Sequence, residues 1–248
     1  MEKKQFDAQL WDARYAAEGY QWKTEPNQFV ARELAGLPPG RALDLAAGEG
    51  RNSVWLASRG WQVTAVDFSR VGLDKGRKLA DQSGVTVDWV VADLLDYEPP
   101  TAQFDLVVIA YLQLPASQAA TVLHRAATAL ADGGTLFFVA HAKRNLTDGV
   151  GGPQDPDVLY TPEGVSAEIP GLRVLRAEDV SREVGDAEAI DTLVRAVRLP
   201  CRRHLGSGRS PPGRYCGPRE ADRRSANRVE LRGLEPLAYW MQTNRSSS

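Results

Sequence analysis

Ala42-Leu43-Asp44-Leu45-Ala46-Ala47-Gly48-Glu49-Gly50-Arg51-Asn52-Ser53 is the stretch from which the fold can be inferred. Its beginning predicts a buried strand, its acidic and glycine-bearing middle predicts a turn, and its end predicts a helix that stops at Gly60. Glycines in such a turn let the backbone approach a ligand that a Cβ would exclude, and the free N–H groups of the helix favour anionic ligand atoms. The stretch therefore predicts a turn that binds a nucleotide-type cofactor.

A dinucleotide-dependent oxidoreductase is one alternative for this turn. The dinucleotide fingerprint is an apolar strand that runs directly into Gly-x-Gly-x-x-Gly. Here Ser53 stands in place of the third glycine, and Asp44 interrupts the apolar strand. Both departures disfavour a dinucleotide.

Composition and charge set the wider limits. The chain has 248 residues, of which 43% are hydrophobic and 25% are charged, as in ordinary globular proteins. No apolar run of about 18 residues predicts a membrane span, and the first residues lack the apolar core of a signal peptide. We therefore expect a cytoplasmic protein without a membrane partner.

The charge changes sign near residue 200. Residues 1–200 carry 20 Lys and Arg against 28 Asp and Glu, a net charge of −8, whereas residues 201–248 carry 10 Arg against 4 acids, a net charge of +6. We expect residues 200–248 to form a basic, disordered tail. Cys201, His204 and Cys216 lack a fourth metal ligand and a recognised spacing, so no metal site is predicted. The acidic main body disfavours a nucleic-acid substrate.

Further acidic residues stand where predicted strands end. Asp67 ends a β-branched strand 17 residues after Gly50, close to the spacing of a ribose-binding carboxylate, although a helix N-cap is the alternative. Ser69 fits that N-cap role better, before a helix over residues 70–82. Asp93 ends the next predicted strand, residues 85–95, where an exposed loop acid is the alternative. Open α/β sheets bind ligands at this edge.

The rest of the chain supplies a cap, a central strand and a long loop. Residues 6–18 and 27–37 predict two helices, whose aromatic residues either pack in the core or cover the cofactor. Residues 104–111 predict a central strand. A helix over 116–131, a turn at 132–134 and a strand over 135–141 follow, and the loop 142–161 is expected to be a substrate lid. Residues 172–184 and 189–199 predict two more strands, the second antiparallel, which makes seven.

The quoted stretch resembles motif I of the class I S-adenosylmethionine (SAM) methyltransferases, usually Asp/Glu-x-Gly-x-Gly-x-Gly, with Ala46 in place of the first glycine. The resemblance implies a Rossmann-like α/β fold: a seven-stranded, mostly parallel sheet with helices on both faces. It divides the chain into an N-terminal cap of the cofactor pocket (residues 1–40), a SAM-binding core (41–199) and the tail. Trp11-Asp12-x-Arg14-Tyr15, Glu25-Pro26 and Gly48-Glu49-Gly50-Arg51-Asn52 look most like the tellurite-resistance/thiopurine methyltransferase-like branch.

This resemblance implies SAM as the cofactor. Asp67 would bind the ribose, Asp93 the adenine amino group, and Leu94 would donate its backbone N–H to the adenine ring. The full set of residues expected to bind the cofactor is Trp22, Asp44, Ala46, Gly48, Gly50, Arg51, Asp67, Phe68, Asp93, Leu94 and Ala110.

The implied reaction is an in-line displacement on the sulfonium methyl, in which the protein aligns the acceptor and excludes water. Ala110-Tyr111-Leu112-Gln113 lacks the Asn/Asp/Ser-Pro-Pro-aromatic motif of amino-group methyltransferases, so we expect a small thiol, metalloid, hydroxyl or amine acceptor. Tyr15, Tyr111 and His141 are candidates for a base by position, and each is equally compatible with mere pocket lining. A SAM-binding regulator without transfer activity is the remaining alternative. The sequence predicts no oligomeric state.

Overall fold

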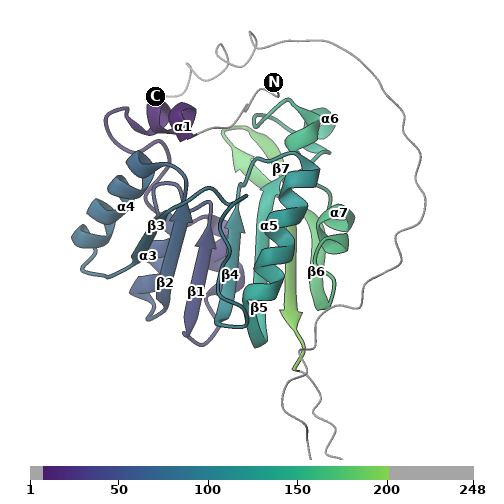
Figure 1. Ribbon diagram of the computed structural model, residues 1–248. Coiled ribbons are helices and arrows are strands. Elements are labelled where there is room, and N and C mark those ends of the chain that lie inside the picture. Colours follow the sequence, from purple (N-terminus) through teal and green to yellow (C-terminus); the bar gives the residue numbers. More distant parts are fainter. Residues whose placement is uncertain (1–7, 201–248) are drawn as a thin grey trace, which may run out of the picture. The chain divides into compact units, whose positions relative to one another are not determined.

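The computed structural model describes residues 8–200, whose strands form a seven-stranded sheet in the order β3-β2-β1-β4-β5-β7-β6 (Figure 1). Neighbouring strands from β3 to β5 are parallel, whereas β7 is antiparallel to both β5 and β6. The strands are β1 (Arg41–Leu45), β2 (Gln62–Asp67), β3 (Asp88–Val91), β4 (Phe104–Ala110), β5 (Leu130–His141), β6 (Leu172–Val184) and β7 (Ala187–Arg198). The predicted Rossmann-like sheet, including its antiparallel strand, is confirmed.

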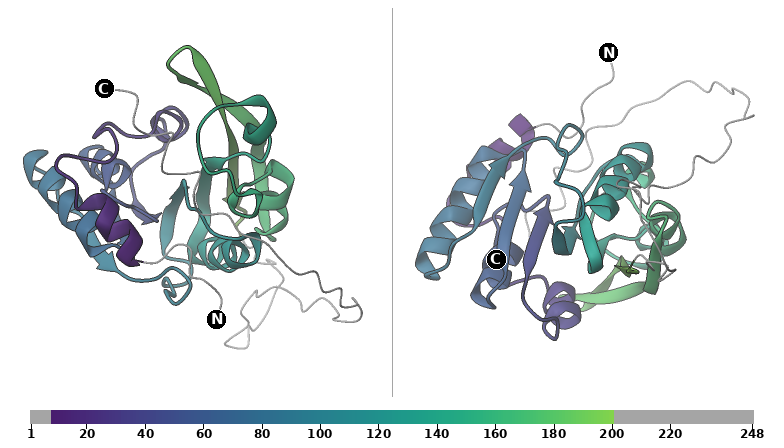
Figure 2. Two further views of the ribbon diagram at one scale, coloured as in Figure 1. Left: turned by 90° about the horizontal axis from the view of Figure 1, so that it is seen from above. Right: turned by 60° about the horizontal axis from the view of Figure 1, so that its bottom comes forward.

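Helices cover both faces of this sheet, as the view from above shows (Figure 2). Apolar residues of α5, including Val122 and Leu123, pack on one face, and Phe29 of α2 and Leu56 of α3 pack on the other. The helices are α1 (Ala8–Tyr15), α2 (Gln28–Leu34), α3 (Arg51–Ser58), α4 (Arg70–Gln82), α5 (Ala116–Ala129), α6 (Asn145–Asp148) and α7 (Pro162–Ala167), with a 3-10 turn at Pro156–Val158. Ser69 caps α4 by accepting the Gly72 N–H, as predicted.

The prediction that a turn at residues 132–134 precedes the fifth strand is wrong. Strand β5 begins at Leu130, immediately after α5, and pairs with β4 through Phe104↔Leu130 and then Leu106↔Thr135. Residues 131–134 therefore oppose the single residue Asp105, and Gly133 has φ 83°. A glycine in the left-handed region lets a strand bulge and resume its ladder, so these turn residues interrupt the pairing without ending the strand.

The third strand is shorter than predicted. Residues 85–95 were expected to be extended, but β3 spans only Asp88–Val91. This strand lies at the edge of the sheet and pairs with β2 alone, which gives its ends no second neighbour to hold them. One further bond, from Ala92 N to Asp67 O, continues the contact toward the carboxyl end of the sheet.

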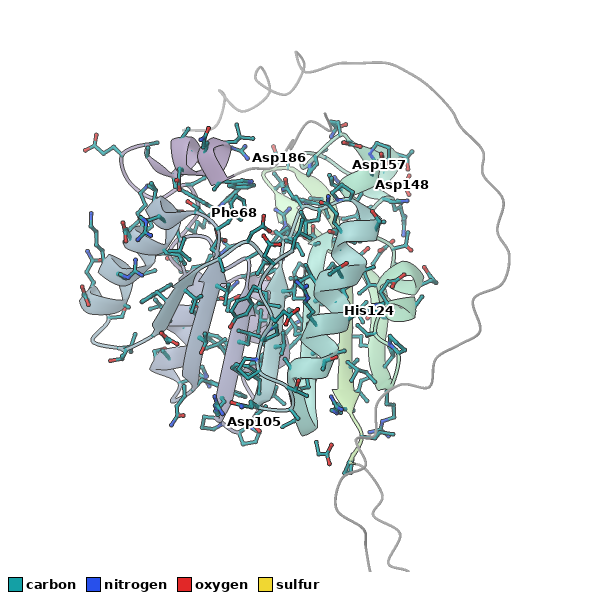
Figure 3. All side chains as sticks on the ribbon, viewed as in Figure 1. Phe68, Asp105, His124, Asp148, Asp157 and Asp186 are labelled. Atoms are coloured by element: carbon teal, nitrogen blue, oxygen red, sulfur yellow. The ribbon has the colours of Figure 1, made fainter. Side chains whose placement is uncertain are left out.

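Figure 3 marks the two ends of the sheet. Phe68 directly follows β2 at the end where the parallel strands finish, and Asp105 lies near the opposite end, at the start of β4. The turn after β1 and the residues that follow β2, β3, β4 and β5 all lie at the first of these ends. This is the edge where an α/β sheet binds its ligands.

Candidate functional site

In the turn between β1 and α3, every second residue has a left-handed backbone conformation. Ala46, Gly48 and Gly50 have φ values of 62°, 55° and 76°. Gly48 donates its N–H to Oδ2 of Asp67 at 2.8 Å, which ties the turn to the end of β2. Glycine adopts this conformation freely, whereas alanine at residue 46 adopts it at a cost of about 1 kcal/mol. The turn is thus held in a shape that its sequence only partly favours.

Side chains of the protein itself occupy the space beside two of these glycines. A Cβ at Gly50 would overlap the ring of Trp89, and a Cβ at Gly48 would lie 2.8 Å from the Tyr15 hydroxyl. Gly72 of α4 also lies against the Tyr15 ring. The need for glycine at residue 50 therefore comes from packing against Trp89 of β3, and at residue 48 partly from the approach of Tyr15.

Asp44 is a fully buried carboxylate on β1. Its Oδ2 accepts a hydrogen bond from the Ser53 hydroxyl at 2.6 Å, while its Oδ1 is buried without a hydrogen-bond partner among residues 8–200. Burial raises the pKa of Asp44 to about 7, against the opposing effect of the Ser53 bond. A buried acceptor without a donor is costly, so Asp44 is suited to a ligand that brings a donor or a positive charge.

Asp67 is held by two backbone donors. Its Oδ2 accepts the Gly48 N–H and its Oδ1 accepts the Ser69 N–H, each at 2.8 Å. Burial raises the pKa of Asp67 to about 6, and the two bonds oppose that rise. Since a carboxylate has about four acceptor sites, each oxygen keeps one for a further donor. The side chain is thereby fixed in position and still able to accept from two hydroxyl groups.

The other residues expected to bind cofactor lie around the same edge with different exposure. Asp93 is exposed and its Oδ1 accepts the Leu95 N–H at 2.9 Å, whereas the side chain of Leu94 is buried in the core on the α5 face. Trp22 is 46% exposed. Phe68, Ala110, Ala46 and Arg51 are half-buried.

Hydrogen bonds join the N-terminal segment to the turn between β1 and α3, which we call the cofactor turn, and to the start of α4. Asp12 Oδ1 accepts from the Ser69 hydroxyl at 2.5 Å and from Val71 N at 3.2 Å. The buried Glu49 accepts the backbone N–H groups of Gln21 and Trp22 and lies 3.3 Å from Lys75 Nζ. Residues 12–22 are therefore fastened to the turn itself.

A second polar cluster lies at the ends of β4, β5 and β7; we call Tyr111, His141, Arg182 and Asp191 the strand-end cluster. The fully buried Asp191 accepts from the Tyr111 hydroxyl at 2.7 Å and from Arg182 Nε at 3.0 Å, both through Oδ2. His141 Nδ1 lies 3.3 Å from Asp191 Oδ1, out of line for a hydrogen bond, and its ring is 4.9 Å from that of Tyr111. Burial would raise the pKa of Asp191, but the nearby His141 imidazole, the bond from Tyr111 and the charge of Arg182 outweigh it and lower that pKa.

The three candidate bases are thus separated by the structure. Tyr111 and His141 meet in the strand-end cluster, whereas Tyr15 packs on Gly48 and Gly72. Burial raises the pKa of both tyrosines well above the usual range, and nearby carboxylates, Asp67 for Tyr15 and Asp191 for Tyr111, add to the rise. Arg51 lies in electrostatic reach of both tyrosines and of Asp44.

Asp191 and Arg182 were missed in the sequence. The register of β5 with β7 places His141 directly opposite Asp191. One signal was present: Asp191 is an acid within the apolar run Ala189-Ile190-Asp191-Thr192-Leu193, just as Asp44 is an acid within β1. A buried acid inside an apolar strand needs partners, and at a strand end those partners form a site.

The loop 142–161 is a folded segment that contains α6 and the 3-10 turn. Asn145 anchors it: Oδ1 accepts the Ile190 N–H at 2.6 Å, and Nδ2 donates to Gly151 O at 2.8 Å. A Cβ at Gly152 would lie 3.0 Å from His141 Nδ1, so the backbone of this segment lies against the imidazole.

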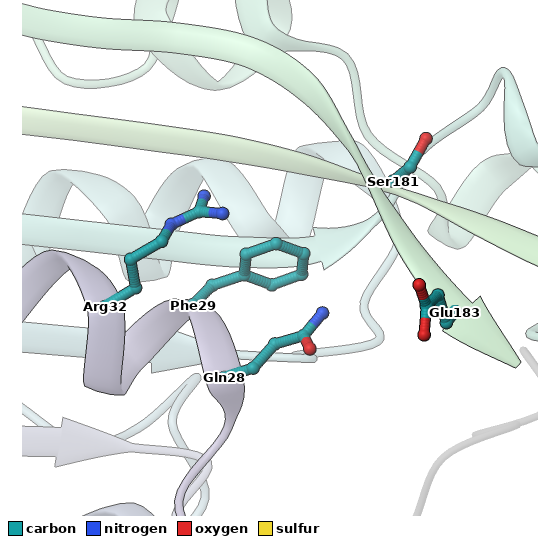
Figure 4. A pocket seen from close by; sticks show the side chains of 5 residues that line it. All are labelled: Gln28, Phe29, Arg32, Ser181 and Glu183. Atoms are coloured by element: carbon teal, nitrogen blue, oxygen red, sulfur yellow. The ribbon is translucent and has the colours of Figure 1, made fainter.

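A groove of about 380 Å³ lies between α2 and β6, lined by Gln28, Phe29, Arg32, Ser181 and Glu183 (Figure 4). None of its lining residues belongs to the strand-end cluster, although two of them are sequence neighbours of Arg182. Asn27, which precedes Gln28, donates to the Tyr111 hydroxyl at 3.4 Å, and Arg182 lies between Ser181 and Glu183. A volume of this size suits a small organic ligand.

Within residues 8–200, no helix has the length and apolar character needed to cross a membrane. In the same residues no three His, Cys, Asp or Glu side chains are grouped so that they could hold a metal ion. Cys201, His204, Cys216 and the predicted tail lie outside the described residues.

Residues 42–134 match the family described as "Methyltransferase domain". The predicted class of enzyme domain, with the SAM cofactor of that class, is thereby confirmed. The narrower tellurite-resistance/thiopurine branch is not settled by this match.

Two relatives of this chain are also named as methyltransferases. Ubiquinone biosynthesis O-methyltransferase of Idiomarina loihiensis is 32% identical over 113 residues, which are 44% of this chain and 46% of that protein. Ribosomal RNA small subunit methyltransferase C of Alcanivorax borkumensis is 29% identical over 144 residues, 56% of this chain and 42% of that protein. The chain thus spans less than half the length of these relatives.

Among solved structures, the N-methyltransferase NodS of Bradyrhizobium japonicum, crystallised with S-adenosylhomocysteine, has a TM-score of 0.58 and 18% identity. The match covers 77% of this chain and 97% of that one. At this identity the likeness concerns the fold.

Proposed function

We propose that this chain is a class I SAM-dependent methyltransferase that acts on a small molecule. The observation that carries the proposal is the pair of buried carboxylates, Asp44 and Asp67, on either side of the glycine turn within the matched methyltransferase domain. SAM is a cation at both its ammonium and its sulfonium group and carries a ribose, so it offers the charge and the donors that these carboxylates lack. When bound, it supplies an activated methyl group with a neutral leaving group.

In this proposal, each part of the cofactor is bound by different residues in or near the turn. Oδ1 of Asp44 would accept from the ammonium group, and Asp67 would accept from the two ribose hydroxyls. Arg51, at the start of α3, would face the carboxylate, where the helix N-terminus adds to the attraction. Asp93 and the Leu94 N–H would bind the adenine.

The remaining residues of the predicted set would form the walls of the pocket. Trp22, Phe68, Ala46 and Ala110 contribute surface, and Gly48 and Gly50 keep the backbone close. Residues 1–40 would cap the pocket over the core of residues 41–199. The bonds of Glu49 in the turn to Gln21 and Trp22, and of Asp12 to Ser69 at the start of α4, support this role for the segment that the structure describes.

The proposed acceptor is a small molecule held near the strand-end cluster. A relative named as an O-methyltransferase supports a small molecule with a hydroxyl group. Similarity to the tellurite-resistance/thiopurine-like branch, on the residues quoted above, keeps a thiol or a metalloid among the candidates. The acidic main body disfavours nucleic acid, although one relative is named for ribosomal RNA. We propose a cytoplasmic location.

Titration calorimetry of SAM into the full chain tests the cofactor site. We expect saturable binding that Asp67→Ala weakens at least about tenfold, since charged hydrogen bonds contribute about 1.5–3 kcal/mol. Asp81→Asn, at the exposed end of α4, is the matched control and should bind like the wild type.

The outcomes separate the three functions that were considered. Binding together with formation of S-adenosylhomocysteine supports the enzyme. Binding without transfer to thiols, metalloids, phenols or amines would favour a SAM-dependent regulator. A folded chain that does not bind SAM but binds NAD(H) would overturn the proposal in favour of an oxidoreductase.

A further inference from the structure

We infer that His141, oriented by Asp191, is the general base of the strand-end cluster, and that the acceptor is therefore a hydroxyl compound that is not ionised at neutral pH. This inference rests on the proposed methyl transfer and names its substrate class. It adds a positioning residue, Asp191, from a strand 50 positions further along the chain than His141.

The geometry gives His141 a defined orientation. Its Nδ1 faces the fully buried Asp191 Oδ1 at 3.3 Å, and both atoms lack a hydrogen-bond partner among residues 8–200. The distance is short enough for a bond after a small rotation of the imidazole. A carboxylate at Nδ1 keeps the proton on that nitrogen and leaves Nε2 as the acceptor. A neutral His141 is then prepared to take a proton at Nε2.

The charged and titratable neighbours of this imidazole come from several elements. Asp191 of β7 contacts it directly, and Arg182 of β6 reaches it through Asp191. Tyr111, at the end of β4, packs against the ring, and Arg51 of α3 acts on Tyr111. The backbone at Gly152 covers the Nδ1 side. One carboxylate therefore offsets the nearer cation, which allows His141 to gain a proton in the reaction.

The two tyrosines do not compete for this role. Burial and the nearby carboxylates keep both phenols protonated at neutral pH, and the Tyr111 hydroxyl already donates to Asp191. Histidine is the side chain whose ordinary pKa lies near neutrality. With both tyrosines excluded, His141 is the candidate that we assign as the base.

The proposed step balances around one proton. The acceptor oxygen forms a bond to the methyl carbon, the carbon–sulfur bond breaks with its electron pair going to sulfur, and the hydroxyl proton moves to Nε2 of His141. Asp191 stabilises the resulting imidazolium until the proton passes to water. A thiol ionises more readily than an alcohol or a phenol, so a base held by a buried carboxylate is most useful for a hydroxyl group.

The test compares His141→Gln, Asp191→Asn and the control His124→Gln in the full chain. His124 lies on α5, 54% exposed, beside Glu168. SAM affinity is measured by calorimetry, and S-adenosylhomocysteine formation is followed with phenol, which is not ionised near neutral pH, and with 4-nitrophenol at a pH where it is ionised. The titration of the His141 imidazole is followed by NMR, which does not depend on turnover.

We expect all variants to bind SAM like the wild type. His141→Gln should slow transfer to phenol by about 10²–10⁴-fold and change transfer to ionised 4-nitrophenol little. Asp191→Asn should also slow transfer to phenol and change the NMR signals of the His141 imidazole, since the carboxylate that faces Nδ1 is lost. His124→Gln should match the wild type in every measurement.

Three outcomes would overturn the inference while SAM binding still supports the proposed function. These are equal losses with both phenols in His141→Gln, a wild type that uses a thiol but neither phenol, and a wild type that binds SAM without methylating any hydroxyl. If Asp191→Asn does not fold, His141→Gln alone decides. Failure of the wild type to bind SAM would instead overturn the proposed function.

Discussion

Replacing Asp44 by asparagine should stabilise the protein without its cofactor at pH 8. Asp44 is buried on β1, and only one of its carboxylate oxygens has a donor. Asparagine keeps an oxygen for the Ser53 hydroxyl and removes the buried charge. We expect the same substitution to weaken SAM binding, because the acceptor proposed for the ammonium group is lost.

The size and sign of the effect follow from the pKa. Burial raises the pKa of Asp44 from 3.8 to about 7. Well below pH 4 the group is protonated in both the folded and the unfolded chain, so it has no effect, and at pH 4 the cost is still below about 1 kcal/mol. As the pH rises toward 7 the unfolded chain releases the proton first, and the folded state becomes less stable. About three pKa units at about 1.4 kcal/mol each give a cost of about 4 kcal/mol above pH 7, an upper bound.

Urea unfolding of the wild type, Asp44→Asn and the surface control Asp81→Asn at pH 4 and pH 8 measures this cost. Asp67, whose pKa is raised to about 6, should add to the wild-type loss in the same direction. We expect Asp44→Asn to exceed the wild type by about 2–4 kcal/mol at pH 8 and to match it at pH 4. A wild-type stability that does not fall between these pH values would refute the argument, as would an asparagine variant that is less stable at both.

Three other substitutions test the turn and the strand-end cluster. Ala46→Gly should raise the free energy of unfolding by about 1 kcal/mol, because alanine there has φ 62°. A lower melting temperature in thermal unfolding would contradict this. Gly50→Ala should cost more than about 2 kcal/mol, since its Cβ overlaps Trp89 and φ is 76°, whereas Gly19→Ala, with open space around it, controls for backbone strain alone. Tyr111→Phe should cost about 1–3 kcal/mol in urea unfolding by removing a donor to the buried Asp191; an unchanged stability would show that this bond contributes nothing.

The positions of the glycine turn and of the acids proposed to bind the cofactor could be predicted from sequence because their signals are local. The strand, the turn and the helix start lie within twelve consecutive residues, and Asp67 and Asp93 each end a predicted strand. Parallel strands bring such ends to one edge whatever the details of packing. The order of the strands then follows from the fold that the motif implies.

The strand-end cluster could not be predicted in the same way. His141 faces Asp191 because β5 and β7 are antiparallel in one particular register, and a shift of one residue would turn Asp191 to the other face. The role of Gly50 likewise depends on Trp89, which arrives from another strand. The residues predicted as a turn at 132–134 bulge inside β5 because β4 continues to pair beyond them. Each of these features depends on contacts between distant segments.

The position of β7 has a consequence for folding. This strand, which ends at Arg198, lies between β5 and β6 and brings Asp191 to His141. Domains form in synthesis from the N-terminus onward, and pairing across long sequence separations is slow. Strands β1 to β4 can therefore associate while β5 still has a free edge, and the cofactor turn should mature before the strand-end cluster. If the turn and His141 act as proposed, a nascent chain would pass through a stage in which it binds SAM but does not yet take a proton from an acceptor.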